Sequence, residues 1–230
     1  MARFYSQFYN QFFFITAASL LGFGLFLLVA NLTYYNIAFI PSVSELIVLN
    51  IGLRITFLSI VFLSQTSRTI LYVEIEDHIE FLEENVQKRH KGLHRQARKW
   101  IQVVIIASYL QTLFFLLVAI VDVDKYPLAH AIVTLVAFLF AILRQVPFFV
   151  IKSLFNVQDQ LWDGLELIHC LAIIVFICVF GAMSYFRADN PYEFNSLFEY
   201  IAVYLVLLLP LYNYPVVEYL IDQRRSDFFD

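Results

Sequence analysis

Long apolar runs alternate with short polar connections along the whole chain. A membrane-spanning helix needs about 20 mostly apolar residues to cross about 30 Å of hydrocarbon. Six runs reach that length, and we expect each to form a transmembrane helix. They cover residues 12–30, 46–73, 100–121, 126–143, 165–185 and 197–217. The pattern predicts an all-α, polytopic membrane protein, with residues 1–230 forming a single six-helix domain.

The composition agrees with this pattern. Hydrophobic residues make up 61% of the chain and charged residues only 15%, and the mean hydropathy is +0.74. A water-soluble core could not enclose so much apolar surface, so membrane lipids are the expected surroundings and nucleic acid is not an expected partner. The sequence has no phosphate-binding glycine loop, GxSxG, HExxH or CxxC motif. Any chemistry must therefore come from isolated polar residues in or near the membrane.

The basic residues predict the orientation of the chain. All lysines and arginines except Arg54, Lys125 and Arg187 fall at or beyond the ends of the predicted helices on one side. The positive-inside rule places that side in the cytosol, together with both termini. The connections near residues 31–45, 122–127 and 186–196 then face the lumen or the outside.

The second predicted helix, over 46–73, is unusually long and contains Arg54 and Arg68 near its two ends. Both arginines could extend toward the headgroups and fix the helix at the two interfaces. Alternatively, Arg54, one turn beyond Asn50, turns into the bundle to meet an acidic headgroup or Glu199.

The connection over 74–99 is acidic in its first half and basic in its second half. Its basic residues could hold it against anionic lipid, at about 1 kcal/mol each near the surface. These residues are Lys88, Arg89, Lys91, Arg95, Arg98 and Lys99. It could equally be a solvated helix with ordinary positive-inside charge. His90 and His94 have the spacing of two metal ligands on one helix face, but the neighbouring cations would repel a metal ion. We therefore expect no metal or cofactor.

Polar residues gather at the predicted lumenal ends of the helices. They are Ser42, Ser44, Glu45, His130, Arg187, Asn195 and Glu199. A His and a Glu at one membrane depth can act as an acid and base pair, a serine can be a nucleophile, and Arg187 can hold a phosphate or stabilise an oxyanion. Helix capping or anchoring at the interface could also explain each of these residues. Near the other end, Glu166 and His169 could form a buried pair or mark a solvated helix end.

Three stretches of the sequence resemble one membrane-protein family. They read NIAFIPSVSELIVLNIGLRITFLSIVFLSQTSR after the first predicted helix, LAHAIV at the fourth and YFRADNPYEFNSLFEYIAVYL at the last. In order and spacing they look like the six-helix family that contains post-GPI attachment to proteins factor 2 and the damage-regulated autophagy modulators. The matching residues are Pro41, Ser42, Val43, Ser44, Arg54, Arg68, His130, Tyr185, Phe186, Arg187, Glu199 and Tyr200. Relatives often show a His and a Pro before the second arginine, where this chain has Ser64 and Ser67.

The resemblance implies a Golgi or endoplasmic reticulum membrane protein that acts in lipid remodelling of GPI anchors, by reacylation of lyso-GPI-anchored proteins. Its partners would be membrane lipids and GPI-anchored proteins. The implied catalytic residues are His130, Glu199 and Ser44, and the implied headgroup-binding residues are Arg187, Arg54, Asn50 and Ser42. The alternative is a non-catalytic membrane protein that regulates lipid organisation, trafficking or autophagy.

Overall fold

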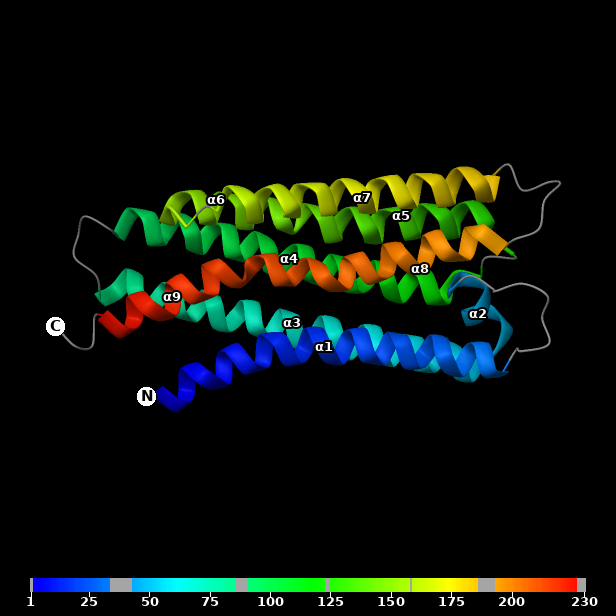
Figure 1. Cartoon of the computed structure of the whole chain (residues 1–230), viewed down its shortest axis with the longest axis horizontal. Coiled ribbons are helices and arrows are strands. Elements are labelled where there is room, and N and C mark those ends of the chain that lie inside the picture. Colours follow the sequence, from blue (N-terminus) through cyan, green and yellow to red (C-terminus); the bar gives the residue numbers. More distant parts are fainter. Residues whose placement is uncertain are drawn as a thin grey trace.

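A computed structural model describes residues 2–33, 43–85, 91–122, 125–157, 159–185 and 193–226. Every regular element in these ranges is a helix. The helices are α1 (Ala2–Thr33), α2 (Val43–Leu49), α3 (Ile51–Asn85), α4 (Lys91–Ile120), α5 (Pro127–Leu143), α6 (Gln145–Phe155), α7 (Gln160–Tyr185), α8 (Glu193–Leu208), the 3-10 helix η2 (Leu209–Asn213) and α9 (Tyr214–Ser226). They run along one common axis, with the start of α1 and the end of α9 at one end of the bundle and α2 at the other (Figure 1). We call these the terminal end and the α2 end.

Five helical segments in the described residues are long and apolar enough to cross a membrane. They are Phe13–Ala30, Lys91–Ile120, Pro127–Phe155, Gln160–Val179 and Phe198–Leu220. Each overlaps one of the predicted runs. The predicted run at 46–73 falls largely in α3, which is not among the five and which combines two arginines with an acidic C-terminal half. The chain thus has the architecture of an α-helical, multi-pass membrane protein.

Apolar and polar side chains are distributed as expected for a bundle in lipid. Large apolar residues such as Leu21, Leu25 and Ile168 lie exposed on the outer surface, while Arg68 and Arg144 are enclosed between helices. A soluble protein could not leave that much apolar surface in water. Polar contacts inside the bundle therefore mark the places where chemistry can occur.

The second predicted run is not one continuous helix. The chain breaks at Asn50, whose side-chain oxygen accepts a hydrogen bond from the Gly52 amide at 2.6 Å and so caps the start of α3. The prediction of a single helix over 46–73 is therefore wrong at this point, because the Asn50 side chain competes with the backbone for the Gly52 amide and so caps a new helix. α3 then continues to Asn85, well beyond the predicted end.

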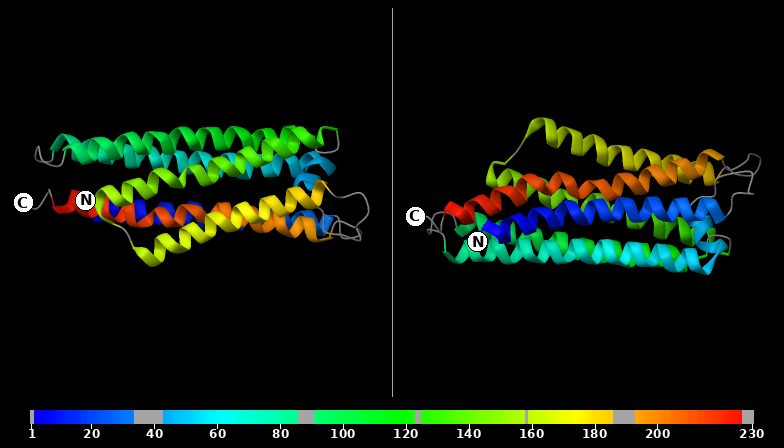
Figure 2. Two further views of the ribbon diagram at one scale, coloured as in Figure 1. Left: turned by 90° about the horizontal axis from the view of Figure 1, so that it is seen from above. Right: turned by 60° about the horizontal axis from the view of Figure 1, so that its bottom comes forward.

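Most of the charged connection over 74–99 belongs to the bundle itself. α3 supplies its acidic part and α4 its basic part, and the two helices pack along each other. Their apolar faces meet α6 and α9 in a core at the terminal end. This core contains Tyr72, Ile75, Ile79, Leu82, Ala97, Ile101, Val104, Phe148, Ile151, Phe155, Val216, Val217 and Leu220. Figure 2 shows α3 and α4 side by side along their length, while the N-terminal end of α7 diverges from the other helices.

Prolines interrupt two of the long helical segments. Pro147 follows the break at Arg144 between α5 and α6, and Pro210 lies where α8 gives way to η2. A proline has no amide hydrogen and leaves the carbonyl four residues earlier without its helical donor. The last carbonyls of a helix also lack donors within the helix. Near the end of α8, the Leu207 carbonyl instead accepts a hydrogen bond from Nη2 of Arg68 at 3.0 Å.

Candidate functional site

Three residues predicted to be catalytic meet at the α2 end of the bundle. Oγ of Ser44 on α2 lies 2.7 Å from Oε1 of Glu199 on α8 and 2.9 Å from Nε2 of His130 on α5. The Ser44 amide also points to Oε2 of Glu199, at 3.4 Å. All three side chains are buried. The structure therefore brings together a hydroxyl, an imidazole and a carboxyl group from three separate helices.

The end of α4 and the start of α5 together orient His130. Pro127 begins α5, a position where its missing amide hydrogen costs nothing, so His130 falls in the first turn. The carbonyl of Val121, just after α4, lies 2.7 Å from Nδ1 of His130. Because a carbonyl can only accept, Nδ1 carries a proton and Nε2 is directed at Ser44.

The hydrogen bonds fix the number of protons in this site. Ser44 has one hydroxyl proton and two partners, so either His130 or Glu199 must donate back to Oγ. Either Nε2 is protonated and Glu199 is ionised, or Glu199 is protonated and Nε2 accepts from Ser44. In both arrangements the three side chains together carry no net charge. Moving two protons along the chain interconverts them, so Ser44 can relay a proton between an acid and a base.

The predicted headgroup-binding residues are distributed differently. Asn50 is exposed and caps α3, as described above. Arg54 is half-buried and donates from Nε to the carbonyl of Ile47 at 3.1 Å, which ties α3 to the end of α2. It does not turn to Glu199. Ser42 and Arg187 lie outside the described residues, so their predicted roles stay predictions.

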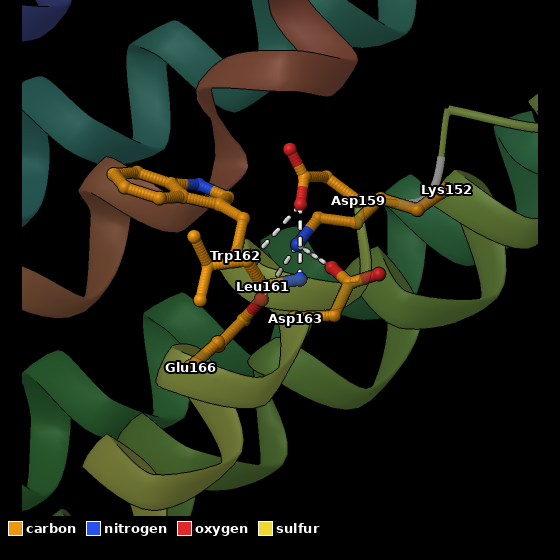
Figure 3. A network of polar contacts seen from close by, with 6 residues as sticks. All are labelled: Lys152, Asp159, Leu161, Trp162, Asp163 and Glu166. Carbon is orange, nitrogen blue, oxygen red and sulfur yellow. Dashed lines mark hydrogen bonds and ion pairs between the residues drawn. The ribbon is translucent and has the colours of Figure 1, made fainter.

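A second polar cluster lies where α6 turns into α7. Lys152 is only 1% exposed, and its Nζ lies 2.6 Å from Oε2 of Glu166 and 2.9 Å from Oδ1 of Asp163. Figure 3 shows the three side chains converging from the two helices. Since Asp163 and Glu166 are three residues apart on α7, they share one face and hold the same ammonium group. The cluster joins α6 to α7 electrostatically.

Local signals in the sequence explain this turn. Asn156 ends α6 in the left-handed conformation (φ 54°), and the amide of Val157 returns to the carbonyl of Lys152 at 2.9 Å. Oδ1 of Asp159 then accepts from the amides of Leu161 and Trp162 at 3.0 and 3.2 Å and caps α7 (Figure 3). The sequence interpretation included Glu166 but missed Lys152, although a lysine 11 and 14 residues before two carboxylates across a turn was a usable signal.

His169 does not pair with Glu166. Its Nδ1 lies 3.1 Å from the hydroxyl of Tyr212 on η2, whereas Glu166 contacts Lys152. Both residues are buried, so neither lies on a solvated surface of α7. The two residues tie α7 to different neighbours, namely η2 and α6.

The basic residues of α4 divide into paired and exposed groups. Arg98 contacts Glu80 at 2.8 Å and Glu76 at 3.5 Å on α3. Arg95 and Lys99, in contrast, are exposed. Lys88 and Arg89 lie outside the described residues. Part of the predicted lipid-binding charge therefore neutralises the acidic half of the same connection.

His94 is buried and packs against the ring of Phe155, with 5.5 Å between the ring centroids. Its predicted metal partner, His90, is outside the described residues. Within the part of the chain that the structure describes, no group of three or more His, Cys, Asp or Glu residues is placed to hold a metal ion.

Comparisons with known proteins identify no relative. No family model, no curated protein and no solved structure matches this chain. Function must therefore be argued from the geometry described above.

Proposed function

We propose that this chain is a multi-pass membrane protein of the secretory pathway that remodels the lipid of GPI anchors, by reacylation of lyso-GPI-anchored proteins in the Golgi or endoplasmic reticulum membrane. The observation that carries the proposal is the contact of Ser44 with both His130 and Glu199. The resemblance to the family that contains post-GPI attachment to proteins factor 2 supplies the substrate class. The same three residues belong to the motifs on which that resemblance depends.

The proposed topology has six spans, with α3 as the additional one, and both termini in the cytosol. The charge asymmetry of the connections supports this orientation. Ser44, His130 and Glu199 then face the lumenal leaflet, where GPI anchors reside. The terminal end of the bundle would lie toward the cytosol.

Acyl transfer follows from the roles that these groups can take. In the arrangement with a neutral imidazole, Nε2 of His130 accepts the Ser44 proton while Oγ attacks the carbonyl carbon of an acyl donor. The imidazolium then gives that proton to the leaving group, whose bond to the carbonyl carbon breaks, and the acyl-serine ester remains. A hydroxyl of the lyso-lipid next attacks the ester and gives its proton to Nε2. As the bond between the acyl group and Oγ breaks, Nε2 passes this proton to Oγ and the Ser44 hydroxyl is restored. Glu199 holds the opposite side of Oγ throughout and orients the hydroxyl toward His130.

Burial of these groups suits transfer to a lipid. A site shielded from water disfavours hydrolysis of an acyl-serine, because the competing nucleophile is kept away. This arrangement differs from a Ser-His-Asp triad, in which the acid contacts Nδ1. Here the Val121 carbonyl takes that position and Glu199 contacts the serine.

The experiment that tests the proposal is the lipid composition of GPI anchors in cells lacking the protein, with rescue by the wild type and by a His130→Ala/Glu199→Gln double variant. Accumulated lyso or unremodelled anchors that only the wild type corrects would support it. His169→Ala is the matched control, since His169 is also buried but contacts Tyr212 instead. Unchanged anchors in the deletion, or full rescue by a well-expressed double variant, would reject it and favour the non-catalytic alternative.

A further inference from the structure

Two arginines are buried in the interior of the bundle, away from the Ser44 site. Arg68 on α3 is 1% exposed and Arg144, between α5 and α6, is 0% exposed. About 21 Å of helix separates Arg144 from His130, at about 1.5 Å per residue. The sequence interpretation that Arg68 extends to the headgroups is therefore wrong, because neighbouring helices enclose it on all sides.

Tyr72 connects the two arginines. It lies four residues after Arg68, on the same face of α3, and the guanidinium carbon of Arg144 is 5.7 Å from the centre of its ring. Both arginines therefore lie next to Tyr72 in the interior of the bundle. A cation over an aromatic face is stabilised, but two neighbouring cations need an anion to offset their repulsion and desolvation.

Each arginine has only part of its hydrogen-bonding capacity satisfied. Arg68 donates from Nη2 to the Leu207 carbonyl, and Arg144 donates from Nη1 to Oε1 of Gln111 at 2.9 Å. Among the described residues, Nε and Nη1 of Arg68 and Nε and Nη2 of Arg144 have no hydrogen-bond partner. None of the ion pairs formed by described residues includes either arginine.

Neighbouring groups add further donors. Within the part of the chain that the structure describes, the Tyr72 hydroxyl and Nε2 of Gln111 are also buried without hydrogen-bond partners. Nearly all of these unsatisfied atoms are donors, so they call for a ligand rich in acceptor oxygens. Two guanidinium groups can each present paired N–H donors to such an oxyanion, and phosphate fits this geometry with several oxygens and a negative charge.

We propose that Arg68 and Arg144, with Tyr72 and Gln111, form a buried binding site for a phosphate group. The phosphate could belong to a lipid headgroup or be free inorganic phosphate, and both would offer the same oxygens. This site is independent of the proposed acyl transfer at Ser44. Its ligand supplies the negative charge that the two arginines lack among the described residues.

The test measures thermal unfolding of the purified full-length protein in a phosphate-free maltoside detergent. Three additions are titrated separately, namely inorganic phosphate, dioctanoyl phosphatidic acid and chloride, with dioctanoylglycerol as the lipid that lacks phosphate. A ligand that binds only the folded state raises the unfolding temperature in a concentration-dependent way. We expect this rise with inorganic phosphate, with phosphatidic acid, or with both, and the pattern distinguishes a free-phosphate site from a headgroup site.

Variants assign the effect to the two arginines. Arg68→Gln and Arg144→Gln should weaken phosphate binding by about tenfold or more, since each removes charge-assisted hydrogen bonds. Lys125→Gln, in the exposed connection before α5, is the control and should leave binding unchanged, because Lys125 is 74% exposed. Tyr72→Phe preserves packing and should weaken binding less, so it tests the site even if an arginine variant fails to fold.

Three results would overturn the site. One is no stabilisation of the wild type by either phosphate compound. Another is an equal effect of chloride or of dioctanoylglycerol, which would show that phosphate is not recognised. The third is phosphate stabilisation that persists undiminished in folded Tyr72→Phe and arginine variants.

Discussion

The Ser44 hydroxyl lies 2.9 Å from Nε2 of His130, although 86 positions separate the two residues in sequence. The contact forms because the tertiary structure brings α2 to the start of α5. Glu199, 155 positions from Ser44, completes it from α8. Because the three side chains come from three helices, a substitution of one should change the contribution of the others to stability. A simple helix cap would not show this coupling.

The first prediction concerns coupling within this site. Ser44→Ala should destabilise the protein by about 1–3 kcal/mol, because it leaves the imidazole and the carboxyl group buried without their bridge. Glu199→Gln keeps the shape of the side chain and should cost less stability, but it cannot exchange a proton with Ser44. Unfolding in detergent, measured for His130→Gln, Glu199→Gln and the double variant, gives their interaction energy.

We expect the effects of His130→Gln and Glu199→Gln to be non-additive, because both act on the same hydroxyl. Function should fall by about 10²–10⁴-fold in His130→Gln if His130 is a general base. Strictly additive stability changes in this cycle would mean that the two side chains are not coupled through Ser44.

The second prediction concerns Lys152. Lys152→Met should destabilise the protein by about 3–5 kcal/mol, because Asp163 and Glu166 then remain without a counter-charge. The Lys152→Met/Glu166→Leu double variant should recover part of this loss. Lys125→Met is the control, since Lys125 is 74% exposed and 3.6 Å from Asp122, and an exposed pair of that kind contributes about 0–1 kcal/mol. Equal stability losses for Lys125→Met and Lys152→Met would refute this assignment.

The third prediction separates paired from exposed cations on α4. If α4 lies on an anionic membrane surface, the protein should be more stable in nanodiscs of anionic lipid than in nanodiscs of zwitterionic lipid. Arg95→Gln and Lys99→Gln should each reduce this difference in the free energy of unfolding by about 1 kcal/mol. Arg98→Gln should change that difference less, because Glu76 and Glu80 already neutralise Arg98. A larger effect for Arg98 than for Arg95 would contradict this division.

The fourth prediction concerns topology. Epitope tags at both termini should be accessible after permeabilisation of the plasma membrane alone, as the proposed cytosolic termini require. A tag inserted beside Lys125, between α4 and α5, should need permeabilisation of the internal membrane as well. Termini on opposite sides would mean an odd number of spans, with α3 as the first candidate for a helix that does not cross.

Much of the fold follows from the sequence because a spanning helix is a local property. A run of apolar residues long enough to cross the membrane satisfies its own backbone hydrogen bonds and needs no distant partner. Five of the predicted runs accordingly overlap helical segments able to span. The break at Asn50 and the length of α3 did not follow, because helix caps and the packing of α3 against α4 outweighed the hydropathy pattern.

The sequence alone identified Ser44, His130 and Glu199 as chemically capable residues at one end of the helices. It could not determine that they touch, because their contact depends on how α2, α5 and α8 pack. Tertiary packing also decided that Arg68 is enclosed in the interior of the bundle, whereas sequence position left it free to reach the headgroups. Apolar runs specify which segments enter the membrane, but the side chains buried between helices depend on rotation and depth, which only helix packing fixes.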